Sequence, residues 1–176
     1  MKESSKTWIL FSLLLIVIAA GARLIPHPYN FSPVGGMILF SGAVFGAFRF
    51  GWVLPLMAMI LSDLILGIHS EMPWVYGALA ANFLLARQML PRERRWTPVR
   101  LGSTSLMAST LFFVISNFGV WFQGSLYPKT FAGWVECYVA AIPFFGGTVV
   151  GDLLYTALFF GLALLWRRQV VAKESA

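Results

Sequence analysis

The chain has 176 residues, of which 59% are hydrophobic and 11% are charged, and its mean hydropathy is +0.77. Soluble domains average roughly 45–50% apolar and 25% charged residues, so this composition excludes an ordinary soluble catalytic domain. Six spans of about 20 residues would use about 120 positions and leave only short loops and tails, which excludes a nucleic-acid-binding module. The single cysteine, Cys137, excludes an internal disulfide and a cysteine-built metal site.

Six apolar segments, separated by polar breaks, follow one another along the sequence. In hydrocarbon every backbone N–H and C=O needs an internal partner, so long continuous apolar runs predict helices. The sequence predicts helices over 8–24, 31–48, 52–68, 74–90, 101–122 and 140–166, with a short outer helix over 131–139. We therefore expect an all-α integral membrane bundle of six transmembrane helices, forming a single domain over 1–176.

The basic residues predict the orientation of this bundle. If the N-terminus is inside and the helices alternate, the formal charge of +6 is distributed unevenly, because only Arg23 and Lys129 fall on the outer side. This asymmetry follows the positive-inside rule and places both termini in the cytoplasm. Tryptophans stand at predicted helix ends, where indole rings favour the headgroup level: Trp8, Trp52, Trp74, Trp121 and Trp166. We expect a multi-pass protein of the bacterial cytoplasmic membrane.

Two segments admit alternative interpretations. The first could be a signal peptide, because 20–22 reads Ala-Gly-Ala like a cleavage site, although the apolar run continues to Ile25. The second contains four glycines, and the Gly42-xxx-Gly46 spacing is typical of helices that pack closely in lipid. A broken or re-entrant segment lining a site is the alternative for this second run.

Polar residues at membrane depth mark the candidate site, since an ionisable side chain there costs a few kcal/mol and needs a partner or a function. The link 23–33 has three prolines within eight residues, which makes it stiff and extended. We expect this link to lie over a mostly apolar pocket with a few directed polar groups, as in small-molecule sites. The candidate substrate-binding residues are Arg23, His27, Asn30, Asp63, Asn82, Asn117 and Asp152.

Each candidate has a binding role and a structural alternative. Asp63 and Asp152 would contact a cationic group of the solute, and Arg23 would contact an anionic one. Arg23 could instead pair with Asp63 or with a lipid phosphate, and Asn82 and Asn117 could bridge helices without touching a ligand. Asp152 is expected to be the charged residue deepest in the membrane, and a purely structural role is hardest to assign to it.

The sequence does not indicate an enzyme. It contains no Ser, His and Asp spacing of a hydrolase, no His-Glu-x-x-His pattern and no phosphate-binding loop. A dyad of Asp63 and Asp152 needs adjacent carboxyls, whereas their expected depths differ by about 10 Å on the helical rise. His27 and His69 stand in separate loops, a weak signal for a metal. We expect no catalytic activity, no cofactor and no metal site, so any ATP-driven role needs separate ATPases.

Short blocks of the sequence resemble a group of small bacterial membrane proteins with no assigned function. The first three blocks read RLIPHPxNFxPV from residue 23, LFxGAxFG from residue 39 and SDLxLG from residue 62. Two later blocks read CYxAAIPFF from residue 137 and GDLxY from residue 151. The resemblance groups the chain with these proteins but implies no particular biochemistry.

The size, helix count and outward pocket also resemble, at the level of architecture, the S components of energy-coupling-factor transporters. This resemblance implies that 23–33 closes over a ligand bound from outside. It also implies work with a transmembrane coupling subunit and two cytoplasmic ATPases, with the small residues of 19–22 available for packing. We therefore expect a substrate-binding subunit for uptake of a small solute, in contact with the lipid bilayer and with no nucleic acid partner. The alternative is a non-transporting membrane scaffold in cell-envelope assembly.

Overall fold

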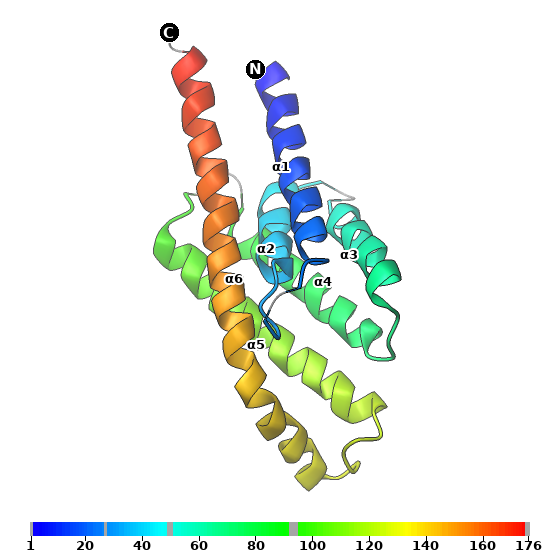
Figure 1. Ribbon diagram of the computed structural model, residues 1–176. Coiled ribbons are helices and arrows are strands. Elements are labelled where there is room, and N and C mark those ends of the chain that lie inside the picture. Colours follow the sequence, from blue (N-terminus) through cyan, green and yellow to red (C-terminus); the bar gives the residue numbers. More distant parts are fainter. Residues whose placement is uncertain (1, 27, 49–50, 92–94, 175–176) are drawn as a thin grey trace.

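The computed structural model describes residues 2–26, 28–48, 51–91 and 95–174. In these ranges it contains six helices and no strand, which confirms the all-α prediction (Figure 1). The helices are α1 (Lys2–Ala22), α2 (Val34–Phe45), α3 (Val53–Leu66), α4 (Met72–Met89), α5 (Pro98–Gln123) and α6 (Phe131–Glu174). Their order and approximate positions follow the apolar segments of the sequence.

Helix α2 forms the centre of the bundle. All of its residues from Gly36 to Phe45 are buried, and it packs mainly against α4 and α6. A Cβ atom placed on Gly42 would lie 2.5 Å from the backbone oxygen of Phe83, so α2 and α4 approach at backbone contact. This confirms a buried, closely packed helix. Its 12 residues span only about 18 Å.

The last helix is longer than the sequence suggests. The expected short helix over 131–139 and the expected segment over 140–166 form one helix of 44 residues, with Pro143 inside it. At 1.5 Å per residue, α6 is about 66 Å long. Figure 1 shows α6 running the full length of the molecule, beside α1 at the end with the termini and beside α5 at the other end.

Two helices, α5 and α6, are long and apolar enough to cross a membrane by length and composition. Three shorter helical stretches are also apolar: Thr7–Ala22, Val34–Phe45 and Pro55–Leu66. A hydrocarbon core of about 30 Å needs about 20 helical residues, so α2 does not cross it alone. Six spanning helices, with both termini in the cytoplasm, stay a prediction.

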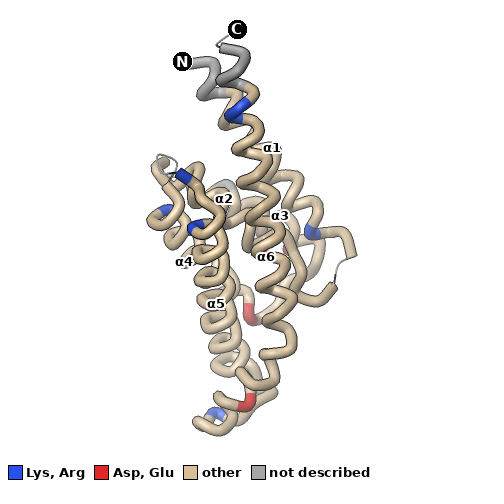
Figure 2. The backbone as a smooth tube through the Cα atoms, turned by 90° about the vertical axis from the view of Figure 1, so that its left-hand side faces the viewer, with Lys and Arg blue, Asp and Glu red and all other residues tan. Residues whose placement is uncertain are grey.

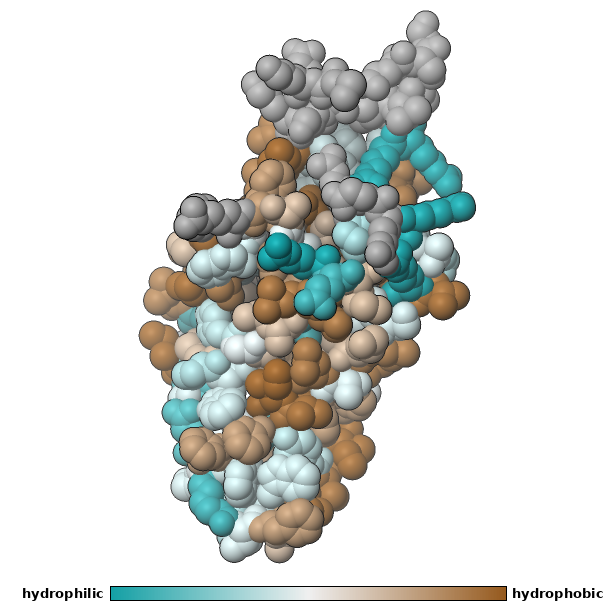
Figure 3. Space-filling view, turned by 180° about the vertical axis from the view of Figure 1, so that it is seen from behind, coloured by the Kyte–Doolittle hydropathy of each residue, from teal (hydrophilic) through white to brown (hydrophobic). Residues whose placement is uncertain are grey.

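The surface is apolar over long stretches of several helices. On α1 Leu10 is 64% exposed, and on α3 Ile65 is 72% exposed. Figure 3 shows hydrophobic and weakly polar residues over most of the body, with the most hydrophilic side chains gathered near the grey termini. In Figure 2 most of the Lys and Arg segments lie in the half that holds the termini, and the Asp and Glu segments lie in the other half.

Candidate functional site

Two carboxylates are buried within the helical bundle. Asp63 on α3 and Asp152 on α6 are each 5% exposed. A charge removed from water is costly unless it is paired and hydrogen-bonded, so each carboxylate needs a compensating partner. The two carboxylates differ in what surrounds them, and this difference locates the candidate site.

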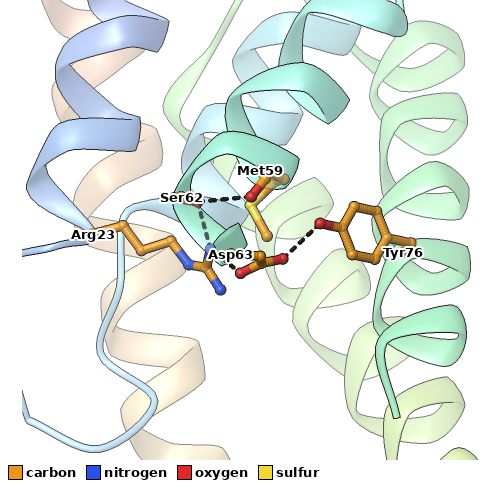
Figure 4. A network of polar contacts seen from close by, with 5 residues as sticks. All are labelled: Arg23, Met59, Ser62, Asp63 and Tyr76. Carbon is orange, nitrogen blue, oxygen red and sulfur yellow. Dashed lines mark hydrogen bonds and ion pairs between the residues drawn. The ribbon is translucent and has the colours of Figure 1, made fainter. Parts of the chain in front are cut away.

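Asp63 is the centre of a polar network that joins three helices (Figure 4). The guanidinium of Arg23, just beyond α1, forms an ion pair with Asp63 and donates to Oγ of Ser62 at 2.5 Å. The Ser62 hydroxyl donates to the carbonyl oxygen of Met59 at 2.8 Å. From α4, the hydroxyl of Tyr76 donates to Oδ2 of Asp63 at 2.6 Å. The network therefore compensates both charges inside the protein.

Asp152 lies against the first turn of α2. A Cβ atom on Gly35 would overlap the Asp152 carboxylate, so only glycine leaves room for the acid there. The hydroxyl of Ser109 on α5 donates to Oδ2 of Asp152 at 2.6 Å. The first turn of a helix has N–H groups without intrahelical partners and a partial positive charge, which favours a nearby carboxylate. Neither of these neighbours carries a full positive charge.

A cavity of about 120 Å³ opens beside Asp152. Its lining comes from the loop before α2 and from α2, α4, α5 and α6. The polar lining residues are Asn30, Ser32, Asn82, Thr148 and Asp152. The apolar ones are Val34, Leu79 and Phe112. A small cavity with apolar walls and a few polar groups has the character of a small-molecule site.

Asn82 brings an unsatisfied acceptor to this cavity. The residue is 1% exposed, and its Nδ2 donates to the carbonyl oxygen of Ala108 at 3.1 Å. Its Oδ1 is buried and has no hydrogen-bond partner among the residues that the structure describes. A buried acceptor without a donor costs about 1–3 kcal/mol. Asn82 therefore contributes to the cavity lining a side chain whose acceptor is unsatisfied.

The segment 28–33 covers the cavity and rests on α6. A Cβ atom on Gly147 would lie 2.5 Å from the backbone oxygen of Tyr29, and one on Gly151 would lie 3.2 Å from the backbone nitrogen of Ser32. Asn30 has a left-handed backbone, with φ of 57°. Such a conformation is uncommon for residues other than glycine but is more accessible to asparagine. The two glycines thus allow the segment to lie directly on the helix.

The structure separates the predicted site residues into groups. Three of them line one cavity: Asn30, Asn82 and Asp152. Arg23 and Asp63 belong to the separate ion-pair network instead.

Asn117 does not join either group. The side chain of Asn117 donates to the carbonyl oxygen of Phe113 at 2.8 Å, within its own helix. Asn117 is not among the residues that line the cavity. His27 lies outside the described residues.

Several contributing hydroxyl residues were not predicted as site residues. Ser32 and Thr148 line the cavity, Ser109 binds Asp152, and Tyr76 binds Asp63. Serine and threonine inside helices commonly bond a carbonyl of the preceding turn, so their presence in an apolar segment is a weak signal. What distinguishes Ser109 from the other hydroxyl residues of α5 is its position opposite Asp152, which the sequence does not reveal.

A third acidic side chain, that of Glu71, lies in the exposed loop between α3 and α4. Ser70 donates to Oε1 of Glu71 at 2.7 Å, and this bond, with His69 nearby, holds the pKa of Glu71 below its ordinary value. The ring nitrogen of His69 lies 3.3 Å from Oε2 of Glu71. Among the described residues there is no group of three or more His, Cys, Asp or Glu side chains that could hold a metal ion.

Together these features define, in the part of the chain that the structure describes, an all-helical protein with exposed apolar helix faces and a small, partly polar cavity among α2, α4, α5 and α6. The chain belongs to the family of unknown function DUF6580, whose model matches residues 2–174. No curated protein and no solved structure matches the chain.

Proposed function

We propose that this chain is an integral membrane protein that binds a small polar solute in the cavity beside Asp152, as the substrate-binding subunit of an uptake system. One observation carries the proposal. Asp152, a buried acid, and Asn82, whose Oδ1 has no hydrogen-bond partner among the described residues, line the same cavity. Both groups are costly to bury as they stand, and a bound polar solute would compensate both.

The composition and the surface support a membrane location. Two helices have the length and apolarity of membrane spans, and large apolar side chains are exposed on α1, α3 and α6. In the orientation that the basic residues favour, the segment 28–33 and the cavity face the outside and both termini face the cytoplasm. A solute would then enter from the outside, past Asn30 and Ser32.

The part of the proposal that concerns transport partners rests on the resemblance to the architecture of S components. Such a subunit works with a transmembrane coupling subunit and two cytoplasmic ATPases, which this chain would need because it has no phosphate-binding loop. The chain itself would bind and release the solute without catalysis and without a cofactor. Its exposed apolar helices offer area for a membrane partner as well as for lipid.

Native mass spectrometry of the gently extracted full-length chain tests this function. We expect a stoichiometric small molecule, or the coupling subunit and ATPases, to be retained. Asp152→Asn should lose the small molecule while remaining folded. Glu136→Gln, which removes an exposed carboxylate from the same helix, is the matched control. A wild-type chain recovered with neither solute nor transport partners would contradict the proposal.

A scaffold in envelope assembly is the second candidate, and one observation favours it. The Arg23–Asp63–Tyr76 network is satisfied inside the protein and ties α1, α3 and α4 together. Polar contacts between helices are a common way to hold a membrane bundle. If this function is correct, Asp152→Asn will leave the biological activity intact, and envelope-assembly proteins will be recovered in place of ATPases.

A further inference from the structure

The cavity beside Asp152 offers negative charge and hydrogen-bond acceptors. Of the two carboxylate oxygens of Asp152, Oδ2 accepts the hydrogen bond from the Ser109 hydroxyl, and Oδ1 of Asn82 has no donor among the described residues. None of the described residues that line the cavity is Lys, Arg or His. Arg23, the cation nearest in sequence to the covering segment, forms its ion pair with Asp63. A ligand that matches these groups must therefore bring positive charge and donors.

The kind of polar group that lines the cavity fits an ammonium group. A primary ammonium carries three N–H donors and no acceptor. Asp152, Asn82 and Thr148 all line the cavity, and each has a side-chain oxygen that can accept a hydrogen bond, as do Asn30 and Ser32. A charge-assisted hydrogen bond to a carboxylate is roughly twice as strong as a neutral one.

The rest of the cavity sets the size and the polarity of the ligand. Val34, Leu79 and Phe112 supply apolar walls, which suit a short alkyl chain. With a volume of about 120 Å³, the cavity suits a small solute.

We infer that the solute bound by this cavity is a small primary ammonium compound. Its nitrogen lies between Asp152 and Asn82, and its short alkyl part contacts Leu79 and Phe112. This inference rests on the proposed function, because it names the class of solute that the same site takes.

Calorimetric titration of the purified full-length chain in an amine-free, sodium-free buffer tests the inference. The probes are ethylammonium, tetramethylammonium, sodium ions and neutral acetamide. We expect ethylammonium to bind, and tetramethylammonium, which has no N–H donor, to bind at least tenfold more weakly. Asp152→Asn should weaken ethylammonium binding about 10- to 100-fold, the effect of losing a hydrogen bond to a charged group. Glu136→Gln should leave the affinity unchanged.

Asn82→Ala and Thr148→Val extend the test, and both should weaken ethylammonium binding. Size-exclusion chromatography and thermal unfolding establish that each variant is folded. If Asp152→Asn does not fold, Asn82→Ala and Thr148→Val carry the test, and unchanged affinity in both overturns the inference.

The outcomes separate failure of this inference from failure of the proposed function. Equal binding of acetamide and ethylammonium, insensitive to Asp152→Asn, overturns the ammonium class and leaves solute binding in place. Binding of sodium ions without ethylammonium also overturns it, in favour of an inorganic cation site. If the folded protein binds no ethylammonium, the inference is wrong, and native mass spectrometry then decides the proposed function independently.

Discussion

The guanidinium of Arg23 forms an ion pair with the carboxylate of Asp63, and this contact joins the end of α1 to α3. Tyr76 adds a hydrogen bond to the same carboxylate from α4. Asp152 is equally buried, but the side chain that donates a hydrogen bond to it is the neutral hydroxyl of Ser109. The burial of Asp63 is therefore explained by its partners within the fold, whereas the burial of Asp152 is the basis of the proposed function.

Breaking the Arg23–Asp63 pair should destabilise the fold. Arg23→Gln leaves a buried carboxylate without its cation, and we expect a loss of about 3 kcal/mol in the free energy of unfolding. Asp63→Asn in the same chain should recover part of that loss, because the uncompensated charge is removed. Denaturant unfolding of both single variants and the double variant measures the coupling. Additive effects of the two substitutions would show that the pair contributes no coupling energy.

Close packing of α2 on α4 should not tolerate a methyl group at Gly42. Its Cβ would lie 2.5 Å from the backbone oxygen of Phe83, so Gly42→Ala should cost about 1–3 kcal/mol through forced helix separation. Gly102→Ala on α5 is the control, because a Cβ there meets no atom within 4 Å. It should be neutral or stabilising by up to about 1 kcal/mol. Similar thermal stabilities of the two variants would argue against the packing.

The covering segment should depend on Gly147 and not on its neighbour Gly146. A Cβ on Gly147 would lie 2.5 Å from the backbone oxygen of Tyr29, whereas a Cβ on Gly146 meets nothing within 4 Å. Gly147→Ala should therefore displace residues 28–33 and speed their amide hydrogen exchange. Gly146→Ala should leave the exchange unchanged. Equal exchange in both variants would show that the segment does not rest on Gly147.

The charge asymmetry predicts which loops face the cytoplasm. Reporter fusions in the loop 124–130 and at the C-terminus distinguish the sides, because one reporter is active only outside the cytoplasm and another only within it. We expect the loop 124–130 outside and the C-terminus inside. If both fusions report the same side of the membrane, α6 does not cross the membrane an odd number of times, and the predicted topology is wrong.

The helical class and the order of the helices could be predicted from the sequence, because hydropathy along a helix is a local property. The apolar run of the fourth segment, expected over 74–90, became α4 at Met72–Met89. The glycine spacing of the second run also predicted its close packing correctly. Charged and amide residues in apolar runs identified Asp152 and Asn82 as candidates before any contact was known.

The continuity of α6 illustrates what local rules miss. The sequence predicted separate helices over 131–139 and 140–166. Proline removes a backbone donor and disfavours helix at the preceding residue, yet α6 continues through Pro143. In the structure α5 contacts α6 on both sides of that proline. The Tyr138 hydroxyl donates to the carbonyl oxygen of Val114 at 2.6 Å, and the rings of Phe113 and Phe145 lie 4.8 Å apart. These tertiary contacts support one helix across the proline.

By itself, the sequence determined an all-helical, strongly apolar chain with a basic bias and a short set of polar candidates. Only the tertiary structure decided that Arg23 compensates Asp63, while Asp152 and Asn82 line a cavity with Asn30. The physical reason is that partners from different helices depend on how those helices are rotated and shifted against one another. That arrangement results from packing across the whole bundle, above all on the buried α2, and no single segment encodes it.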